Sequence, residues 1–288
     1  MNFREKLLSG KFLITAEISP PKGTDTTGLL KDADLIKGCI DAINITDNQR
    51  AVMRMSPLAA CIMLRQQGCE TIMHLTCRDR NRLALQADIL GASALGIKNI
   101  LVMSGDHPVK GDHTGAKPVY DLDPVQLLEL IRKMKSGFDL AGSRLDGKID
   151  ICAGAVTNTE MNEVAFYKFQ KKIKIGARFF QTQAVFDIDR FSQFMNSINK
   201  IPKVKIIAGI IPLRSEKNAI FLNSKIACIK VPEKIINRMQ VAKNPGKEGM
   251  KIAAELITGL RSICDGVHIM PIGGHENTRE ILEMAGII

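Results

Sequence analysis

Short apolar runs alternate with longer stretches of helical period from residue 12 to the C-terminus. Eight of the runs are rich in Val, Ile and Phe and are bounded by turn residues, which is typical of buried β-strands. The predicted strands cover residues 12–18, 41–46, 70–75, 99–104, 150–156, 178–183, 204–211 and 266–270. The stretches between them place apolar residues at helical spacing. They predict helices at 26–38, 56–67, 79–95, 123–137, 161–176, 188–199 and 215–224, and a region at 233–264 that can hold two helices.

Strands that alternate with helices indicate repeated βαβ units and a parallel sheet, because a parallel crossover needs about a dozen residues and is usually a helix. Eight such units in 288 residues fit a (β/α)8 (TIM) barrel, whose usual size is about 250 residues. The alternative is an open doubly wound sheet, which would call for a Gly-x-Gly-x-x-Gly turn after the first strand. The chain reads Ser-Pro-Pro-Lys-Gly there. No linker or composition shift divides the chain, so we predict one α/β barrel domain over residues 1–288.

The composition adds a basic surplus to this picture. Forty Lys and Arg residues against 30 Asp and Glu give a net charge of +10, which favours an anionic ligand. The charge is spread along the chain and is not interleaved with aromatic base-stacking platforms, so we expect no nucleic acid partner. No segment approaches the roughly 18 apolar residues of a membrane span, and the N-terminus lacks a signal-peptide pattern. We therefore expect a cytoplasmic protein with no membrane partner.

The cysteines indicate core packing rather than disulfides or a metal site. The seven are Cys39, Cys61, Cys69, Cys77, Cys152, Cys228 and Cys264. None forms a Cys-x-x-Cys pair or lies at zinc-finger spacing from a histidine. His74, Cys77, Asp106 and His107 match no strong pattern of metal ligands. We expect reduced thiols in the core and no metal.

Polar residues gather at the C-terminal ends of the predicted strands, where (β/α)8 barrels build their active sites. Glu17 interrupts the first apolar run at a place where burying a carboxylate without a purpose would be costly. Gly105 and Asp106 follow the fourth run, where a glycine lets the backbone approach a ligand closely. Two acids on different strands can divide the roles of proton donor and fixed negative charge. His74 and His268 are more readily explained as core histidines bonded to backbone carbonyls.

Five segments in one order and spacing carry a family resemblance: AEISPPKGTD near the start, HLTCRDR (74–80), GIKNILVMSGDHP (96–108), KIGARFFQTQAVFD (174–187) and IIAGIIPL (206–213). With these segments the chain resembles the methylenetetrahydrofolate reductase family over nearly its whole length. The resemblance implies a (β/α)8 barrel that binds FAD without a Rossmann motif. It also implies a reaction that passes a hydride from reduced FAD to 5,10-methylenetetrahydrofolate, giving 5-methyltetrahydrofolate.

The resemblance assigns roles to residues at the strand ends. Glu17 is the implied general acid that helps open the five-membered ring of the folate, and we expect partial burial to raise its pKa so that it keeps a proton near neutral pH. Asp106 is the second implied catalytic residue and lies near both flavin and pterin. Gln183 is implied to hold the folate, because an amide can donate and accept along a pterin edge, and Asn218 is a further implied substrate contact. The implied FAD contacts are Thr46, His74, Gly105, Asp106, Tyr120, Asn158 and Lys172.

Departures from the family pattern bear on the electron donor. Ser104 replaces the arginine of an Arg-Gly-Asp block, Asp47 and Asn48 replace a Tyr-Gly pair, and the last strand runs into HIMPIGGHE in place of an aromatic Thr-Leu-Asn run. Residues 111–127 resemble the branch of the family found in acetogens, for which a cysteine-rich iron-sulfur partner subunit is expected. The chain has no cluster motif of its own. We expect NAD(P)H or such a partner subunit as the electron donor, and a homo-oligomer or hetero-complex as the assembly.

Two other functions stay open from the sequence. A pterin-binding barrel that transfers methyl groups to a corrinoid protein would need folate but no flavin. A basic binding or scaffold subunit would have kept the barrel and lost the chemistry. A binding-only role has no need of Glu17 and Asp106, which disfavours the second alternative.

Overall fold

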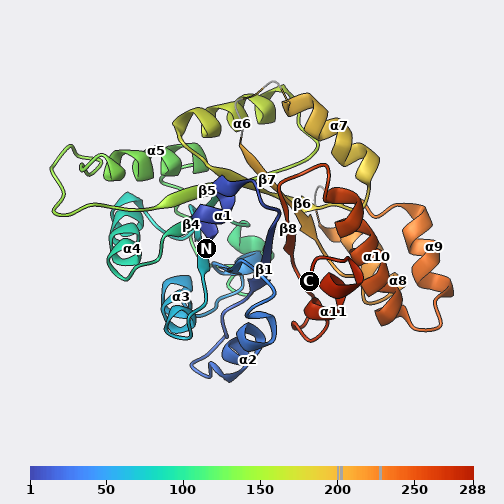
Figure 1. Ribbon diagram of the computed structural model, residues 1–288. Helices are drawn as coiled ribbons and strands as arrows, with labels where there is room; N and C mark the ends of the chain where they lie inside the picture. Colours follow the sequence, from blue (N-terminus) through green and yellow to red (C-terminus); the bar gives the residue numbers. More distant parts are fainter. Residues whose placement is uncertain (200, 202–203, 227–228) are drawn as a thin grey trace.

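The computed structural model describes residues 1–199, 201, 204–226 and 229–288. Eight parallel strands close into a barrel in the order of the sequence, and the last strand pairs with the first (Figure 1). The strands are β1 (Leu13–Ile18), β2 (Ala42–Ile45), β3 (Thr71–Thr76), β4 (Asn99–Met103), β5 (Cys152–Thr157), β6 (Phe179–Ala184), β7 (Lys205–Ile210) and β8 (Gly266–Ile269). Each strand overlaps a predicted run, so the predicted (β/α)8 barrel is confirmed and the open doubly wound sheet is wrong.

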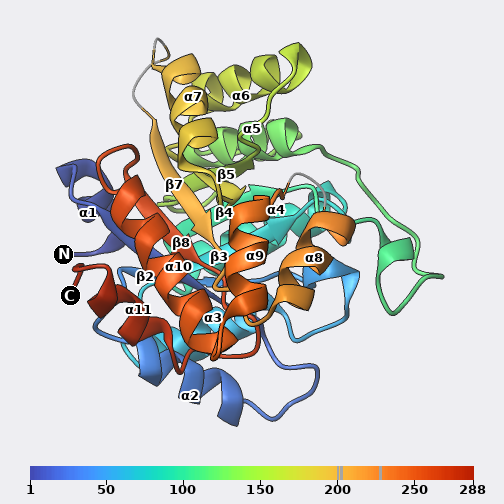
Figure 2. The same ribbon diagram turned by 90° about the vertical axis from the view of Figure 1, so that its right-hand side faces the viewer.

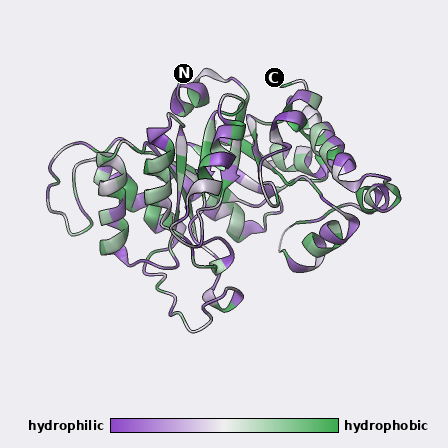
Figure 3. Cartoon of the chain, turned by 90° about the horizontal axis from the view of Figure 1, so that it is seen from below, coloured by the Kyte–Doolittle hydropathy of each residue, from purple (hydrophilic) through white to green (hydrophobic). Residues whose placement is uncertain are grey.

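The helices lie outside the barrel and turn their apolar faces toward the strands. They are α2 (Thr27–Ile36), α3 (Pro57–Gln66), α4 (Arg82–Ala94), α5 (Pro124–Lys135), α6 (Glu163–Ile175), α7 (Ile188–Ile198), α8 (Glu216–Lys225), α9 (Glu233–Val241) and α10 (Pro245–Leu260). Figure 3 shows hydrophobic and hydrophilic residues alternating along these helices, as expected for helices with one buried face. All of these helices overlap the predicted ranges, and α9 and α10 are the two expected within residues 233–264.

Four short elements were not predicted. They are the helices α1 (Phe3–Ser9) and α11 (Thr278–Met284) and the 3₁₀ turns η1 (Gln49–Ala51) and η2 (Pro108–Lys110). On one side of the barrel α8 packs on α9 and α9 on α10 (Figure 2). The same view shows the segment between β4 and α5, which contains η2, reaching outward from the barrel.

Helix α1 seals the N-terminal end of the barrel. It begins with a capping box, in which the Asn2 side chain accepts from the Glu5 backbone N–H and the Glu5 side chain accepts from the Asn2 backbone N–H. Phe3 is completely buried and meets the ring of Phe179 on β6 edge to face, with the ring centres 5.2 Å apart. Gly154 on β5 makes room, because a Cβ there would lie 2.4 Å from the Phe179 ring. The lower half of the barrel is therefore a packed apolar floor, which leaves the C-terminal end of the strands for the site.

The cysteines lie as expected in the part of the chain that the structure describes. Cys39, Cys61, Cys69, Cys77 and Cys152 are free and buried, and Cys264 is free and half-buried. Burial raises the pKa of the Cys61 thiol to about 12, so this group stays protonated. Cys228 lies outside the described residues.

Candidate active site

A connected network of polar side chains crosses the barrel interior above the apolar floor. Thr15 on β1 pairs with His268 on β8, and Thr15 Oγ1 lies 2.9 Å from His268 Nδ1. Gln181 on β6 donates to Thr15 Oγ1 over 3.4 Å and exchanges two hydrogen bonds, of 2.8 and 3.2 Å, with Asn44 on β2. Asn44 Nδ2 also donates to His74 Nε2 on β3 over 2.9 Å. All five side chains are buried, and the network supplies the hydrogen bonds that buried polar groups require.

The two histidines of this network differ from the core histidines expected from the sequence. His74 and His268 bond to side chains of the network rather than to backbone carbonyls. Burial lowers the pKa of His74 to about 4, and the nearby charge of Glu17 offsets this only in part. Because Asn44 donates to Nε2, the proton of the neutral His74 ring lies on Nδ1. His74 is therefore a neutral group at physiological pH.

The C-terminal ends of the strands form the mouth of the barrel. Glu17 lies there, near the end of β1, beside the polar network. Its side chain is 13% exposed. Gln49 in η1 donates from Nε2 to Glu17 Oε1 over 2.7 Å, and His268 Nε2 lies 3.7 Å from Glu17 Oε2. The ring of His275 contacts the backbone of Glu17, with Nε2 2.8 Å from the carbonyl oxygen. The carboxylate is thus held from two sides and open toward solvent on a small part of its surface.

The expected rise in the pKa of Glu17 is not what the structure shows. Burial does raise the pKa of this carboxyl, but the nearby His268 and the hydrogen bond from Gln49 lower it by more. The net result is a pKa below the usual value for glutamate. In this arrangement Glu17 is a carboxylate at neutral pH. It can act as an acid only after its surroundings change.

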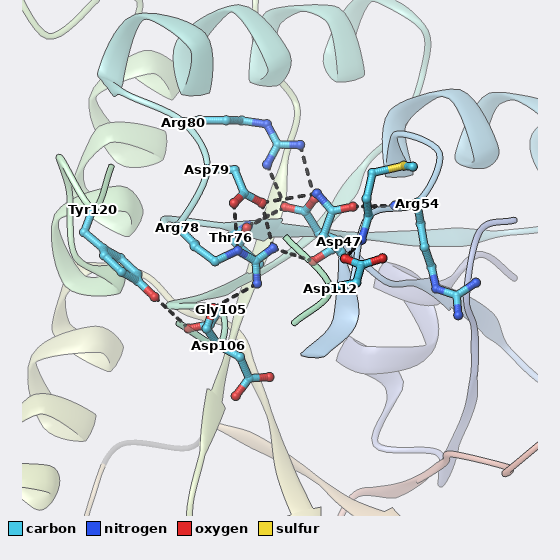
Figure 4. A network of polar contacts seen from close by, with 12 residues as sticks. Asp47, Arg54, Thr76, Arg78, Asp79, Arg80, Gly105, Asp106, Asp112 and Tyr120 are labelled. Carbon is cyan, nitrogen blue, oxygen red and sulfur yellow. Dashed lines mark hydrogen bonds and ion pairs between the residues drawn. The ribbon is translucent and has the colours of Figure 1, made fainter. Parts of the chain in front are cut away.

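A second cluster of polar contacts joins the ends of β2 and β3 (Figure 4). Asp47 follows β2, and its completely buried carboxylate accepts from the backbone N–H of Thr76 over 2.9 Å and from the Thr76 hydroxyl over 2.8 Å. Arg80 pairs with the same carboxylate, with Nη1 2.7 Å from Oδ2, and also with Asp88 over 2.7 Å. Asp47, which departs from the family pattern, therefore ties β2 to the segment that follows β3.

Arg78 lies beside this cluster and is only 2% exposed. Its Nε and Nη2 donate to the carboxylate of Asp79 over 2.7 and 2.6 Å, and its Nη1 donates to the backbone carbonyl of Asp106 over 3.2 Å. Gly105 has a φ of +81°, and a Cβ there would lie 3.1 Å from Arg78. The left-handed backbone and the packing of this loop on Arg78 therefore both favour glycine here, and the approach of a ligand to Gly105 stays a prediction. Arg78 therefore places a guanidinium group beside this loop, in which Ser104 replaces the arginine of the family pattern.

The segment between β4 and α5 carries Asp106 and Tyr120. The Tyr120 hydroxyl donates to the backbone carbonyl of Gly105 over 3.2 Å, so the two predicted flavin contacts lie together. The Asp106 side chain is 48% exposed, with Oδ1 3.9 Å from Lys110 Nζ, and its carboxylate points away from the arginines in Figure 4. Within the described residues, no hydrogen bond or ion pair joins Asp106 to Glu17. The two acids are thus in different settings, one buried in the mouth and one on a projecting loop.

Three further predicted residues line the strand ends. Thr46 is buried after β2, and its hydroxyl donates to Ser19 Oγ over 3.2 Å. Gln183 is exposed near the end of β6. Lys172 on α6 donates to the carbonyl of Val156 at the end of β5 over 3.0 Å, and burial lowers the pKa of its ammonium group. These residues lie at the same end of the barrel as Glu17, and their roles stay predictions.

The two remaining predicted residues lie in loops beyond the strands. Asn158 is half-buried directly after β5. Asn218 lies in the first turn of α8, where its Oδ1 accepts from the backbone N–H of Arg214 over 3.3 Å. The amide oxygen of Asn218 thus supports the start of its own helix, and contact of either residue with a ligand stays a prediction.

Several site residues had no assigned role in the sequence reasoning. Asn44 is a polar residue inside an otherwise apolar strand, which is the same signal that pointed to Glu17. Arg78 and Arg80 come directly after the third strand, and charged residues at that end of a barrel strand indicate a site. Gln49 gave no signal, because its contact with Glu17 depends on the path of the turn that carries it.

Among the residues that the structure describes, no group of three or more His, Cys, Asp or Glu side chains could hold a metal ion. Within the same ranges, every helix is too short or too polar to cross a membrane.

The barrel is closed, its N-terminal end is sealed, and its ionisable and amide side chains lie at the mouth. These features are typical of (β/α)8 proteins, which build their chemistry at the C-terminal ends of the strands. Residues 2–286 match the family model described as methylenetetrahydrofolate reductase. The chain therefore belongs to the methylenetetrahydrofolate reductase family, and the resemblance seen in the sequence is confirmed.

Individual relatives are similar to this chain at low identity. Methylenetetrahydrofolate reductase 2 of Schizosaccharomyces pombe is 26% identical over 75% of this chain and 34% of its own length. The probable methylenetetrahydrofolate reductase (NADPH) of Caenorhabditis elegans is 24% identical over 83% of this chain and 36% of its own. The chain thus spans about a third of the length of these relatives. The 5,10-methylenetetrahydrofolate reductase of Pectobacterium carotovorum subsp. carotovorum is 24% identical over 73% of this chain and 67% of its own.

A similar solved structure supports the fold. An uncharacterized protein from Clostridium thermocellum, which binds two copies of 5-methyl-5,6,7,8-tetrahydrofolic acid, superposes with a TM-score of 0.68. The match covers 98% of this chain and 96% of the other, at 19% identity.

Proposed function

We propose that this protein reduces 5,10-methylenetetrahydrofolate to 5-methyltetrahydrofolate with FAD as its cofactor, and that Glu17 is the general acid. The observation that carries the proposal is the setting of Glu17. Its carboxylate lies next to His268 of the buried polar network, and 13% of the side chain is exposed at the mouth of the barrel. Family membership supports this class of reaction, and the place of the carboxylate at the mouth supports a role in proton transfer.

The mouth offers groups suited to a folate. Gln183 presents an exposed amide that can donate and accept along a pterin edge, and Asp106 adds a carboxylate on the adjoining loop. The net charge of +10 favours the approach of an anionic folate. The similar barrel from Clostridium thermocellum binds a reduced folate, so a barrel of this shape can accommodate one.

The residues from β2 to β5 fit FAD in their chemistry. Thr46 offers a hydroxyl, His74 a neutral imidazole, and Lys172 an ammonium group suited to a diphosphate. Val119 and Tyr120 are 42% and 38% exposed on the loop at this edge, which leaves apolar surface for a ring system to cover. When bound, FAD supplies the hydride, and the chain supplies orientation and electrostatics.

In this proposal Glu17 gives its proton to the substrate and becomes a carboxylate. His268 lies behind the carboxylate and is fixed by Thr15, so it can stabilise the charge that remains. Because the pKa of Glu17 lies below its usual range without substrate, substrate binding has to raise it. A folate that excludes water from the mouth would do so, since loss of hydration disfavours the carboxylate.

The electron donor in the proposal is NAD(P)H or an iron-sulfur partner subunit. The names of the relatives point to NADPH in Caenorhabditis elegans and to NADH in Oryza sativa. The donor is therefore a property to measure on this chain, with each reductant added separately to the flavin-loaded protein.

The test of the function is the Glu17→Gln variant in two separate half-reactions. Reduction of bound flavin should be nearly unchanged, and transfer to the folate should fall by at least about 10², the usual contribution of a general acid. Glu70→Gln is the matched control. It makes the same chemical change at the N-terminal end of β3, far from the mouth of the barrel, where the Glu70 carboxylate accepts from Asn99 over 2.7 Å. Equal loss in both half-reactions of Glu17→Gln would show that Glu17 is structural.

The methyltransferase alternative is less well supported than the reductase, because the family match names a reductase. The same protein preparation distinguishes them. Folate binding without any bound flavin, together with methyl transfer to a corrinoid protein, would overturn the proposed function.

A further inference from the structure

The amide of Gln49 is the closest partner of the Glu17 carboxyl. Gln49 Nε2 donates to Glu17 Oε1 over 2.7 Å, and Gln49 Oε1 accepts from the Ser19 hydroxyl over 3.0 Å. Ser19 Oγ in turn accepts from Thr46 Oγ1 over 3.2 Å. Both ends of the amide are therefore engaged, and its donor end faces the carboxylate.

The backbone that carries this amide is strained. Asn48, Arg50 and Ala51 have φ values of 46°, 58° and 56°, in the left-handed region that residues other than glycine rarely adopt. Such a conformation persists only where the surroundings enforce it, and it concentrates at functional sites. Here three strained residues flank Gln49, the residue of this turn whose side chain bonds to Glu17.

Contacts on both sides enforce the strain. The Asn48 side chain donates to Asp79 over 3.2 Å and accepts from the backbone N–H of Arg54 over 2.9 Å. From the other side, Gly111 of the β4–α5 segment packs so closely that a Cβ there would lie 1.8 Å from the Ala51 carbonyl oxygen. The turn is therefore held in place by the ends of two neighbouring strands.

The next residue of the same segment pins the chain beyond the turn. Asp112 accepts from the backbone N–H of Met53 over 3.1 Å and pairs with Lys22 over 2.5 Å. Hydrogen bonds from Lys22 and His113 hold the pKa of Asp112 well below its usual range, so this anchor stays charged. The backbone position of Gln49 is thus fixed by contacts of its turn with neighbouring segments of the fold.

An amide in this place can serve both protonation states of Glu17. Toward the carboxylate it donates an N–H, as observed. Toward the carboxylic acid it can turn over and accept the O–H, because its oxygen and nitrogen ends occupy equivalent positions. The Ser19 hydroxyl tolerates the exchange, since it can donate to the amide oxygen or accept from the amide nitrogen.

We propose that Gln49 is a positioning residue, whose amide holds the Glu17 side chain in one orientation while Glu17 gains and loses its proton. This rests on the proposed function only for the identity of the proton's recipient, which is the substrate. The other groups that face Glu17 are His268 and His74 from the barrel wall, with His275 at its backbone. Each of these is a ring fixed by other contacts, so the amide is the partner that can turn over.

The test is a direct titration of Glu17 in the ligand-free protein. The carboxyl carbon signal of Glu17 is assigned by its loss in Glu17→Gln and followed with pH. In Gln49→Met, which keeps the length of the side chain and removes both ends of the amide, the midpoint should rise by about one pH unit, because the hydrogen bond that the charged carboxylate loses is stronger than the one that the neutral acid loses. Gln193→Met makes the same change on the exposed face of α7 and should leave the midpoint where it is.

Two further readouts separate positioning from a general structural effect. In the wild-type protein the side-chain amide signals of Gln49 should titrate with the same midpoint as the Glu17 carboxyl. Gln49→Glu keeps the length, cannot donate and adds a like charge, so it should raise the midpoint by more than Gln49→Met. A Glu17 midpoint that stays unchanged in both variants would overturn the proposal.

The outcome for Gln49 is independent of the outcome for the reaction. If the protein fails to reduce the folate while the Glu17 midpoint moves as expected, the proposed function fails and the role of Gln49 stands. If folate reduction is present and the midpoint does not move, the role of Gln49 fails alone.

Discussion

Removal of the buried carboxylate of Asp47 should destabilise the protein strongly. The Asp47 side chain has no exposed surface and accepts four hydrogen bonds, two from Thr76 and two from Arg80, over 2.7 to 3.2 Å. Breaking one side of a buried ion pair typically lowers the free energy of unfolding by about 3–5 kcal/mol. We expect a loss in this range for Asp47→Ala, because Thr76 loses its acceptor and Arg80 keeps only Asp88.

The assay is urea unfolding of the wild-type protein and three variants. Asp47→Asn should lose less, about 2 kcal/mol, because its amide oxygen still accepts from Thr76 while the bond to the charged Arg80 is lost. Asp121→Ala is the matched control, since it removes a carboxylate whose pair with Arg82 lies on the surface, and its effect should be much smaller. A loss below about 1 kcal/mol for Asp47→Ala would refute the claim that this cluster holds β2 to β3.

Three more predictions concern other parts of the barrel. Phe3→Ala should lower the free energy of unfolding in urea by about 3–5 kcal/mol, because Phe3 is completely buried against Phe179, and a loss near zero would show that α1 does not seal the floor. The pKa of His74 falls from 6.5 to about 4, so the unfolded chain binds more protons between these values and stability should fall by about 3 kcal/mol as the pH drops from 6.5 to 4. His74→Gln keeps an acceptor for Asn44 and should flatten this part of the pH profile of stability. An equally steep profile would show that His74 does not cause this loss of stability. Asp106→Asn should change both the flavin spectrum and the dissociation constant for folate, and unchanged values of both would remove Asp106 from the site.

The strands and most helices could be predicted from the sequence because each unit buries one face against its neighbours along the chain. Helix α1 was missed although its capping box, Asn2 to Glu5, is visible in the sequence. Seven residues carry too little periodicity to indicate a helix. Its role at the floor depends on the contact between Phe3 and Phe179, which are far apart along the chain.

The place of Glu17 at the C-terminal end of β1 could be predicted as well, because a carboxylate in an apolar strand needs a purpose. The direction of its pKa could not. That direction depends on the partners Gln49 and His268, which reach Glu17 from a strained turn and from the last strand. The same holds for Gly105, whose left-handed backbone serves the buried Arg78, a contact that only the folded barrel creates.

Flavin-dependent reduction of the folate can be observed directly in the anaerobic reaction of the FAD-loaded, chemically reduced protein with 5,10-methylenetetrahydrofolate, followed by flavin absorbance. We expect the oxidised flavin bands to return as 5-methyltetrahydrofolate forms, and in Glu17→Gln to return at least about 10² more slowly. Protein that binds no FAD, or reduced flavin that persists in the presence of the folate, would show that the protein does not catalyse this reaction.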